Sequence, residues 1–157
     1  MGRFYLDLEF TNVNYYLADI IEMSIVAAET NHEFHRYVRI PYPIPPIVKK
    51  LTNITDETLV TYGSSFRDAM QALVHFISTE STGTDHPIII AHGGYFTDFP
   101  ILFANCFKYE FHDLDVFQQC TFVDSVKLLQ NVGYVKPGLD ALCNNLCFST
   151  YSSFSVR

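Results

Sequence analysis

The sequence contains no tryptophan, and it also lacks the segments that would send a chain to a membrane or out of the cell. No apolar run is long enough to cross a bilayer. The N-terminal segment MGRFYLDLEF does not have the pattern of a cleavable secretory signal. Leu6 stands where an N-myristoylation sequence carries Ser or Thr. We therefore expect an intracellular protein, cytoplasmic or nuclear, with no membrane partner.

Cysteine is scarce, and its spacing does not indicate a metal site. The four cysteines are Cys106, Cys120, Cys143 and Cys147. The last two are one helical turn apart, and the first two do not complete a zinc-binding pattern with them. We expect reduced thiols buried in the protein, as is usual in the cytosol and nucleus.

Basic residues are outnumbered by acidic ones, 10 against 17, which gives a formal net charge of −7. This balance argues against a protein that coats duplex DNA with a broad basic face. It is compatible with an enzyme that holds metal ions on carboxylates, because bound cations reverse the local charge.

The chain has 157 residues and 48% hydrophobic side chains, which suggests one domain with a sizeable core. Its apolar periodicity predicts three strands, then helices that alternate with two more strands. The strands are expected at 3–9, 19–29, 32–40, 87–92 and 120–125. The helices are expected at 46–51, after Thr55, and at 64–79, 98–107, 126–132 and 138–148. An antiparallel three-stranded meander followed by strand–helix alternation predicts an α/β fold with a mixed five-stranded sheet flanked by helices.

Asp7 and Glu9 lie in the first expected strand, RFYLDLEF, and side-chain alternation places both on the same face. Two neighbouring carboxylates repel each other, and burying either one unpaired is costly. A divalent cation such as Mg²⁺ or Mn²⁺ compensates this best, because these ions prefer oxygen ligands. The simpler interpretation, solvated acids on an edge strand, is less favoured because Phe4, Leu6 and Leu8 make this an apolar strand.

Asp98 is a third candidate acid, in the segment AHGGYFTDFPIL. It follows a buried strand and a Gly-Gly turn and begins a helix, the position where open α/β sheets place their active sites. Taken alone, Asp98 could equally be an acid that stabilises the helix dipole.

Six segments in this order resemble the DEDD-type 3′–5′ exonucleases, which have an RNase H-like fold. They are FYLDLEF, DIIEMSIVA, LTNIT, AHGGYFTDFPIL, FVDSVKLL and GLDALC, which together span nearly the whole chain. The Asp-Phe-Pro after the third acid is most similar to the TREX-type three-prime repair exonucleases. The resemblance implies a 3′–5′ exonuclease that hydrolyses the terminal phosphodiester bond of single-stranded DNA or RNA with two metal ions, Mg²⁺ or Mn²⁺.

The resemblance also implies roles for individual residues. Asp7 would bridge both ions, Glu9 would bind one ion and touch the terminal nucleotide, and Asp98 would act on the second ion through water. The chain after Glu9, at Phe10 and Thr11, would line the pocket for the last base, and Thr97 would lie at the same pocket.

Several positions depart from the family pattern. Gly93 stands where the family usually has Asn, Thr97 where the TREX type has Tyr, and Asn12 where a Gly is common. The family's last helix carries a catalytic His and, five residues later, the fourth Asp. No His follows His112 here, and no acidic residue follows Asp140. We therefore expect a single domain over residues 1–157 that ends before that helix.

Two consequences of this departure stay open at the level of sequence. The sequence could be a fragment of an active exonuclease, or a naturally shortened and inactive domain that binds nucleic acid or protein. A residue from elsewhere, such as another subunit, could also complete the site. Apolar surface left without the last helix could be covered in a homodimer.

Three other residues have two interpretations each. His92 after the fourth strand is expected to be structural rather than catalytic. Tyr15 and Tyr16 could stack on bases or pack within their own loop, with neither favoured.

Overall fold

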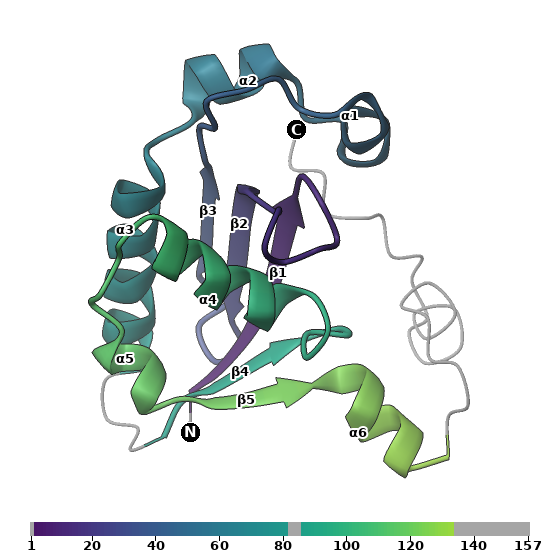
Figure 1. The fold of residues 1–157 in the computed structure, drawn as a ribbon. Helices are drawn as coiled ribbons and strands as arrows, with labels where there is room; N and C mark the ends of the chain where they lie inside the picture. The colour runs from purple at the N-terminus through teal and green to yellow at the C-terminus, as the bar shows by residue number, and fades with distance from the viewer. Residues whose placement is uncertain (1, 82–85, 134–157) are drawn as a thin grey trace.

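The computed structural model describes residues 2–81 and 86–133, and its elements follow the expected order (Figure 1). The strands are β1 (Arg3–Phe10), β2 (Ile20–Ala27), β3 (Glu33–Tyr37), β4 (Ile88–Ala91) and β5 (Thr121–Asp124). The helices are α1 (Pro46–Thr52), α2 (Asp56–Tyr62), α3 (Phe66–Glu80), α4 (Asp98–Lys108), α5 (Asp115–Gln118) and α6 (Ser125–Asn131).

The five strands form one mixed sheet in the order β3-β2-β1-β4-β5. β1, β2 and β3 are antiparallel neighbours, whereas β4 is parallel to β1 and β5 is parallel to β4. This confirms the expected meander with added parallel strands. The chain crosses from β3 to β4 through α1, α2 and α3, and β1 therefore lies at the centre of the sheet.

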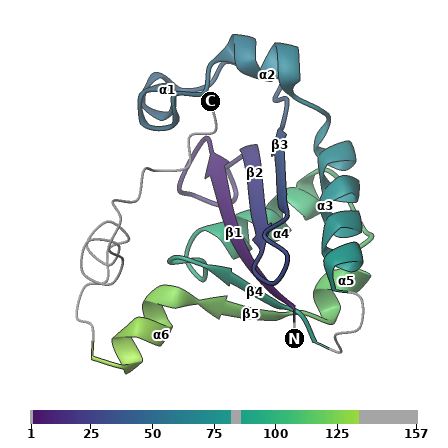
Figure 2. The same cartoon turned by 180° about the vertical axis from the view of Figure 1, so that it is seen from behind.

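The main core lies on the sheet face that α3 and α4 cover (Figure 1). Alternation in β1 points Phe4, Leu6 and Leu8 into this core, where they meet Met70 and Leu73 of α3. The opposite face presents Tyr5, Asp7 and Glu9. In the view from behind, no described helix lies in front of β1, β2 and β3 (Figure 2). The two faces of the sheet therefore differ in chemistry: one is the core, and the other carries the candidate acids.

The helix boundaries follow local signals. Thr55 caps α2 by accepting a hydrogen bond from the Thr58 amide, and Ser65 caps α3 by accepting one from the Asp68 amide. α1 begins at Pro46, where the missing amide hydrogen costs nothing.

The observed elements differ from the expected ones in a few places. The second and third strands are shorter than 19–29 and 32–40, because the chain turns at residues 28–30 and leaves the sheet before the prolines at 41 and 43. The short helix α5 was not expected, since four residues are too few to show a helical period. The helix expected at 138–148 lies outside the described residues.

A buried acid joins three distant segments beside the end of β1. Asp19 is 1% exposed and accepts hydrogen bonds from Lys108 Nζ at 2.6 Å, from Tyr109 Oη at 2.5 Å and from Tyr42 Oη. Burial opposes ionisation, but these donors hold the pKa of the Asp19 carboxyl below its usual value. The contacts fix the start of β2 to the end of α4.

No helix within residues 2–81 and 86–133 combines the length and apolar character that crossing a membrane requires.

Candidate active site

Alternation in β1 puts Asp7 and Glu9 on the face opposite its buried residues. The described helices do not cover this face of β1, β2 and β3 (Figure 2). Asp7 keeps contact with solvent, and Glu9 is partly buried. Among the described residues, neither carboxylate has a hydrogen-bond donor or a cationic partner. The sequence predicts that these acids need a compensating partner. No side chain of the described residues supplies one.

Asp98 joins them across 90 residues of sequence, because its Oδ1 accepts a hydrogen bond from the Leu8 amide at 3.1 Å. Leu8 separates Asp7 from Glu9, and β4 pairs with β1 only as far as Tyr5. Asp98 thus occupies the side of β1 that β4 leaves free. Its Oδ2 accepts a second hydrogen bond from Thr97 Oγ1 at 2.7 Å. The structure therefore brings the three predicted acids together at one end of β1.

The turn between β4 and α4 brings Asp98 to this place. Gly93 has φ of +75°, a value that suits glycine. A Cβ on Gly94 would lie 2.6 Å from the Cβ of Ala91 and 2.9 Å from the ring of Phe99, so the turn is too tight for a side chain there. The predicted role of the two glycines, a close turn beside the site, matches this geometry.

Asp124 holds the same turn from β5. Its Oδ1 accepts hydrogen bonds from the amides of Gly93 at 3.0 Å and Val126 at 2.9 Å, and its Oδ2 accepts one from Tyr95 at 3.2 Å. The residue is buried, and its carboxylate is occupied by these amides. Asp124 therefore positions the loop that leads to Asp98.

The carboxyls of the site hold their protons more tightly than isolated acids do. Partial burial, with repulsion from Asp98 and Glu22, raises the pKa of Asp7 to about 6. Burial followed by repulsion from Asp7, Glu22 and Asp98 raises the pKa of Glu9 to about 7. Burial also raises the pKa of Asp98, although the donors Thr97 and Leu8 oppose the rise. The acids are thus close enough to destabilise one another when ionised.

A divalent cation would relieve this repulsion, and the donors are of the oxygen type that Mg²⁺ and Mn²⁺ prefer. In residues 2–81 and 86–133, no group of three His, Cys, Asp or Glu side chains is arranged to hold a metal as it stands. The donor set therefore fits such a cation in chemistry and charge, but its described side chains do not form a coordination geometry.

The predicted substrate-binding residues are close in sequence to the acids, and the polar groups of Thr11 and Thr97 are already hydrogen-bonded. Thr11 is buried; its amide donates to the Asp19 carbonyl at 2.9 Å, and its hydroxyl accepts from the Asp19 amide at 3.0 Å. Phe10 ends β1 and packs against the main core. The Thr97 hydroxyl donates to Asp98 and lies 3.2 Å from the Gly93 carbonyl. Thr97 thus orients the third acid directly.

His92 lies outside the group of acids. Its Nδ1 is 2.9 Å from the hydroxyl of Ser125, the first residue of α6. This contact matches the structural role expected for His92.

Sequence reasoning missed Glu22 as a neighbour of the acids. β2 places Glu22 directly opposite Glu9 in the antiparallel register. The expected meander could have indicated this neighbour, because paired strands place residues from the same face side by side. The sequence pattern did not determine the register, so it could not show which residue of the second strand faces Glu9.

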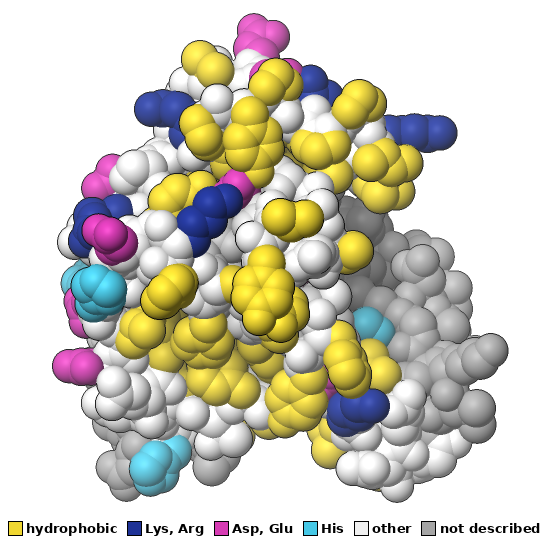
Figure 3. Space-filling view, in the orientation of Figure 1, with side chains coloured by type: hydrophobic (Ala, Val, Ile, Leu, Met, Phe, Trp, Pro, Cys, Tyr) yellow, Lys and Arg dark blue, Asp and Glu magenta, His cyan; other side chains and the backbone are white. Residues whose placement is uncertain are grey.

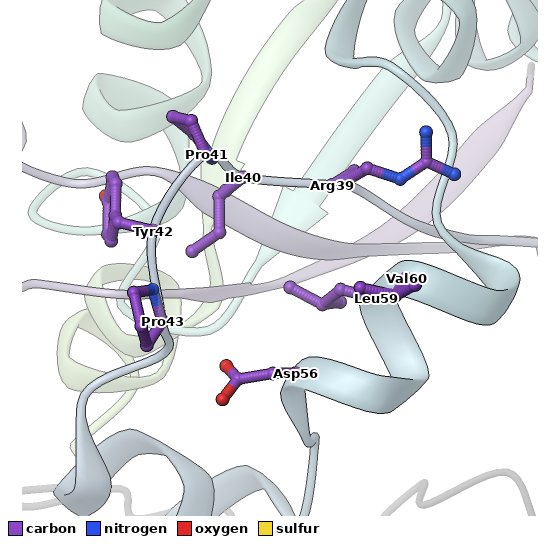
Figure 4. A pocket seen from close by; sticks show the side chains of 8 residues that line it. All are labelled: Arg39, Ile40, Pro41, Tyr42, Pro43, Asp56, Leu59 and Val60. Carbon is purple, nitrogen blue, oxygen red and sulfur yellow. The ribbon is translucent and has the colours of Figure 1, made fainter.

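A surface hollow at a distance from these acids shows different chemistry. A pocket of about 250 Å³ lies between α2 and the segment after β3 (Figure 4). Its Asp56 is bound to Lys49 and to the Ile44 amide, and its Arg39 donates to the Gly63 carbonyl. The charged groups that line this pocket therefore already have structural partners.

Hydrophobic side chains gather on the face over α4 (Figure 3). A groove of about 560 Å³ there is lined by Tyr15, Tyr16, Pro100, Ala104, Phe107 and Lys108. The rings of Tyr15 and Tyr16 pack against each other, with centroids 4.2 Å apart, and both remain exposed. The two tyrosines therefore pack within their own loop and also keep rings that are accessible to a ligand. The two interpretations left open by the sequence do not exclude each other.

The sheet topology and the acids at the end of β1 define an RNase H-like nuclease domain. A family model for the Exonuclease family, RNase_T, matches residues 4–151. The chain therefore belongs to this family of DEDD exonucleases. The expected fold and family are confirmed, and the assignment to the TREX type stays a prediction.

Solved structures of exonuclease I share the fold. Product-bound exonuclease I superposes with a TM-score of 0.70 at 13% identity, over 89% of this chain and 35% of that chain. Exonuclease I of E. coli in complex with a dA16 oligonucleotide gives a TM-score of 0.65 at 13% identity, over 83% of this chain and 29% of that chain. The present chain thus spans about a third of the length of these structures. No curated protein sequence matches the chain.

Proposed function

We propose that this domain is a metal-dependent 3′–5′ exonuclease that removes nucleotides from single-stranded nucleic acid ends. The observation that supports this best is the hydrogen bond from the Leu8 amide to Asp98, because it brings the third acid to the strand of Asp7 and Glu9. Membership of the exonuclease family supplies the class of reaction.

The proposed cofactor is a pair of Mg²⁺ or Mn²⁺ ions held by Asp7, Glu9 and Asp98. When bound, such ions supply an activated water and neutralise the charge that develops on the phosphate. Asp7 and Glu9 are both close enough to Asp98 to be repelled by it, which suits ligands that share a pair of ions. Asp98 already accepts a hydrogen bond on each oxygen, which favours binding through water.

The proposed nucleotide pocket lies beyond Glu9, along Phe10 and Thr11, with Thr97 at its edge. Because the amide and hydroxyl of Thr11 are engaged with Asp19, this segment would present a rigid wall to the terminal base. The zinc-bound complex of E. coli exonuclease I with single-stranded DNA provides a precedent for such a substrate on this fold. Both DNA and RNA are candidate substrates, because contacts to the sugar determine which of the two is preferred.

A second candidate is a domain that binds nucleic acid or a protein without cleaving. It is favoured by one observation: within residues 2–81 and 86–133, no group of three His, Cys, Asp or Glu side chains is arranged to hold a metal ion.

A gel assay separates the two candidates. The 157-residue chain is incubated with 5′-labelled single-stranded DNA or RNA and Mg²⁺ or Mn²⁺, beside Asp7→Ala. The proposed activity gives a ladder that shortens from the 3′ end and disappears in the variant. Retarded bands without a ladder would support binding alone. Cleavage that persists in Asp7→Ala would contradict the proposed site.

A further inference from the structure

The strand register puts a fourth acid next to the proposed site. Glu22 of β2 is opposite Glu9 of β1, and Ser24 is opposite Asp7. Side chains opposite each other in an antiparallel pair have Cβ atoms about 5 Å apart and share one face. Glu22 therefore projects from the same open face as Asp7 and Glu9, within reach of a ligand that both could touch.

Two glutamates opposite each other are an unfavourable pair, since like charges in this position destabilise a sheet. Both are partly buried, which weakens the screening of their repulsion by water. A glutamate at this position is costly for the sheet unless a hydrogen-bond donor or a cation offsets the repulsion.

His35 of β3 holds Glu22 in place. Its Nε2 is hydrogen-bonded to Glu22 Oε1, and the two side chains are 28% and 16% exposed. The ring of Tyr37 supports the imidazole edge-on, with centroids 4.7 Å apart at 90°. Among the described residues, Glu22 Oε2 has no hydrogen-bond partner. One oxygen is thus fixed by His35, and the other is available to a ligand.

Asp124 is a further acid near Asp98, but its own hydrogen bonds leave its carboxylate unavailable to a metal ion. Both of its oxygens accept amide hydrogen bonds from the turn before α4 and from α6. Glu22 differs from Asp124 because, among the described residues, one of its two oxygens is hydrogen-bonded and the other is not.

We infer that Glu22, oriented by His35, supplies an additional carboxylate to the divalent cation bound beside Glu9, directly or through one water. Glu22 is then a ligand of the site, and His35 is a positioning residue that acts through it. The inference rests on the proposed function, because it needs a cation on Asp7 and Glu9. The site thereby gains a fourth acid, which comes from β2, the strand next to β1 in the sheet.

Mn²⁺ binding to the full 157-residue chain, measured by titration calorimetry, tests this without relying on cleavage. Glu22→Gln keeps the shape and removes the charge, and we expect about tenfold weaker Mn²⁺ binding or more. His35→Ala should weaken binding by a similar factor, and His35→Gln, which keeps a donor, should recover part of the loss. Circular dichroism confirms that each variant is folded.

Glu33→Gln is the matched control, since it removes the same charge from the same sheet face at an exposed position of β3. We expect its Mn²⁺ affinity to stay within about twofold of the parent, as for a surface charge screened by salt. An equal loss in Glu22→Gln and Glu33→Gln would overturn the inference, because a general charge effect would explain both.

Asp7→Asn separates this inference from the proposed function. If Asp7→Asn abolishes Mn²⁺ binding while Glu22→Gln and His35→Ala bind like the parent, the inference fails and the proposed function stands. If Asp7→Asn binds Mn²⁺ like the parent, the proposed site itself fails and the inference fails with it. Should Glu22→Gln not fold, the contrast between His35→Ala and His35→Gln decides the question.

Discussion

Leu8 contributes to the site through its backbone rather than its side chain. Its side chain is buried in the core, while its amide donates to Asp98 Oδ1. A buried amide without an acceptor would cost stability, so this hydrogen bond serves the fold and places the acid at once. Two substitutions at Asp98 can separate these roles.

Asp98→Asn keeps an oxygen for the Leu8 amide and removes the negative charge. We expect a folded protein that cleaves at least about 100-fold more slowly, because a charged ligand is lost. Asp98→Ala should also lose stability, by about 1–3 kcal/mol relative to Asp98→Asn, because the buried amide is left unpaired. Urea unfolding and the gel assay measure the two effects. Equal stability of the two variants would contradict the role of this hydrogen bond.

Asp7 and Glu9 give the metal-free protein a pH dependence. Their folded-state pKa values, about 6 and about 7, lie above those of unfolded acids, so the folded protein binds protons more tightly. Their contribution to stability is fully present below about pH 4 and is lost as pH rises through 7. In EDTA, the free energy of unfolding should therefore fall between pH 5 and 8.

Asp7→Asn should flatten this decline, since it removes one of the two repelling charges and lowers the pKa of Glu9. Urea unfolding of both proteins at several pH values in this range is the measurement. A decline of the same slope in Asp7→Asn would mean that other groups produce it.

At the scale of elements, the β4–α4 turn is the part of the fold on which the site depends most. It must reverse the chain within a few residues and deliver Asp98 to β1. Asp124 accepts amide hydrogen bonds from this turn, and Phe99 packs against it. The turn therefore links β5 to the position of Asp98.

Gly94→Ala should disturb this turn. The new methyl group would lie 2.6 Å from the Ala91 Cβ and 2.9 Å from the Phe99 ring, so the segment must shift. We expect a loss of about 1–3 kcal/mol in stability and weaker Mn²⁺ binding. Thermal melting and calorimetry measure these changes.

Gly93→Asn is the comparison for this prediction. Nothing lies within 4 Å of a Cβ at Gly93, and its φ of +75° is one that Asn adopts more readily than most residues. A smaller loss than in Gly94→Ala is expected. The reverse order would show that backbone conformation, not close packing, limits the turn.

At the scale of the whole molecule, the sheet has one face for stability and one for chemistry. The helices α3 and α4 cover the core face, and the acids of β1 and β2 lie on the other (Figures 1 and 2). Repulsion among these acids is a cost to the folded state, and a bound cation would remove it. Metal binding should therefore stabilise the entire domain.

Mn²⁺ at about 100 times its dissociation constant should add about 2.7 kcal/mol to the stability at pH 7.5. This corresponds to a rise of about 5–10 °C in Tm for a domain of this size. Asp7→Asn should show no rise, and Glu33→Gln should behave like the parent. Scanning calorimetry with and without Mn²⁺ is the measurement, and an equal rise in Asp7→Asn would place the ion elsewhere.

The sequence alone determined the order of the elements and the acids of the site. Alternation in RFYLDLEF put Asp7 and Glu9 on one face, and the Gly-Gly segment placed Asp98 at the start of a helix. These features are local, because strand period, caps and turns depend on neighbouring residues. The short helix α5 escaped because four residues contain too little pattern.

Only the tertiary structure decided which distant groups meet. The hydrogen bond from Leu8 to Asp98 spans 90 residues, and the register that sets Glu22 against Glu9 changes face with a slip of one residue. The contact of His35 with Glu22 depends on the same register. Such contacts follow from how the strands pair and how the helices pack on them, and no short stretch of the sequence specifies either.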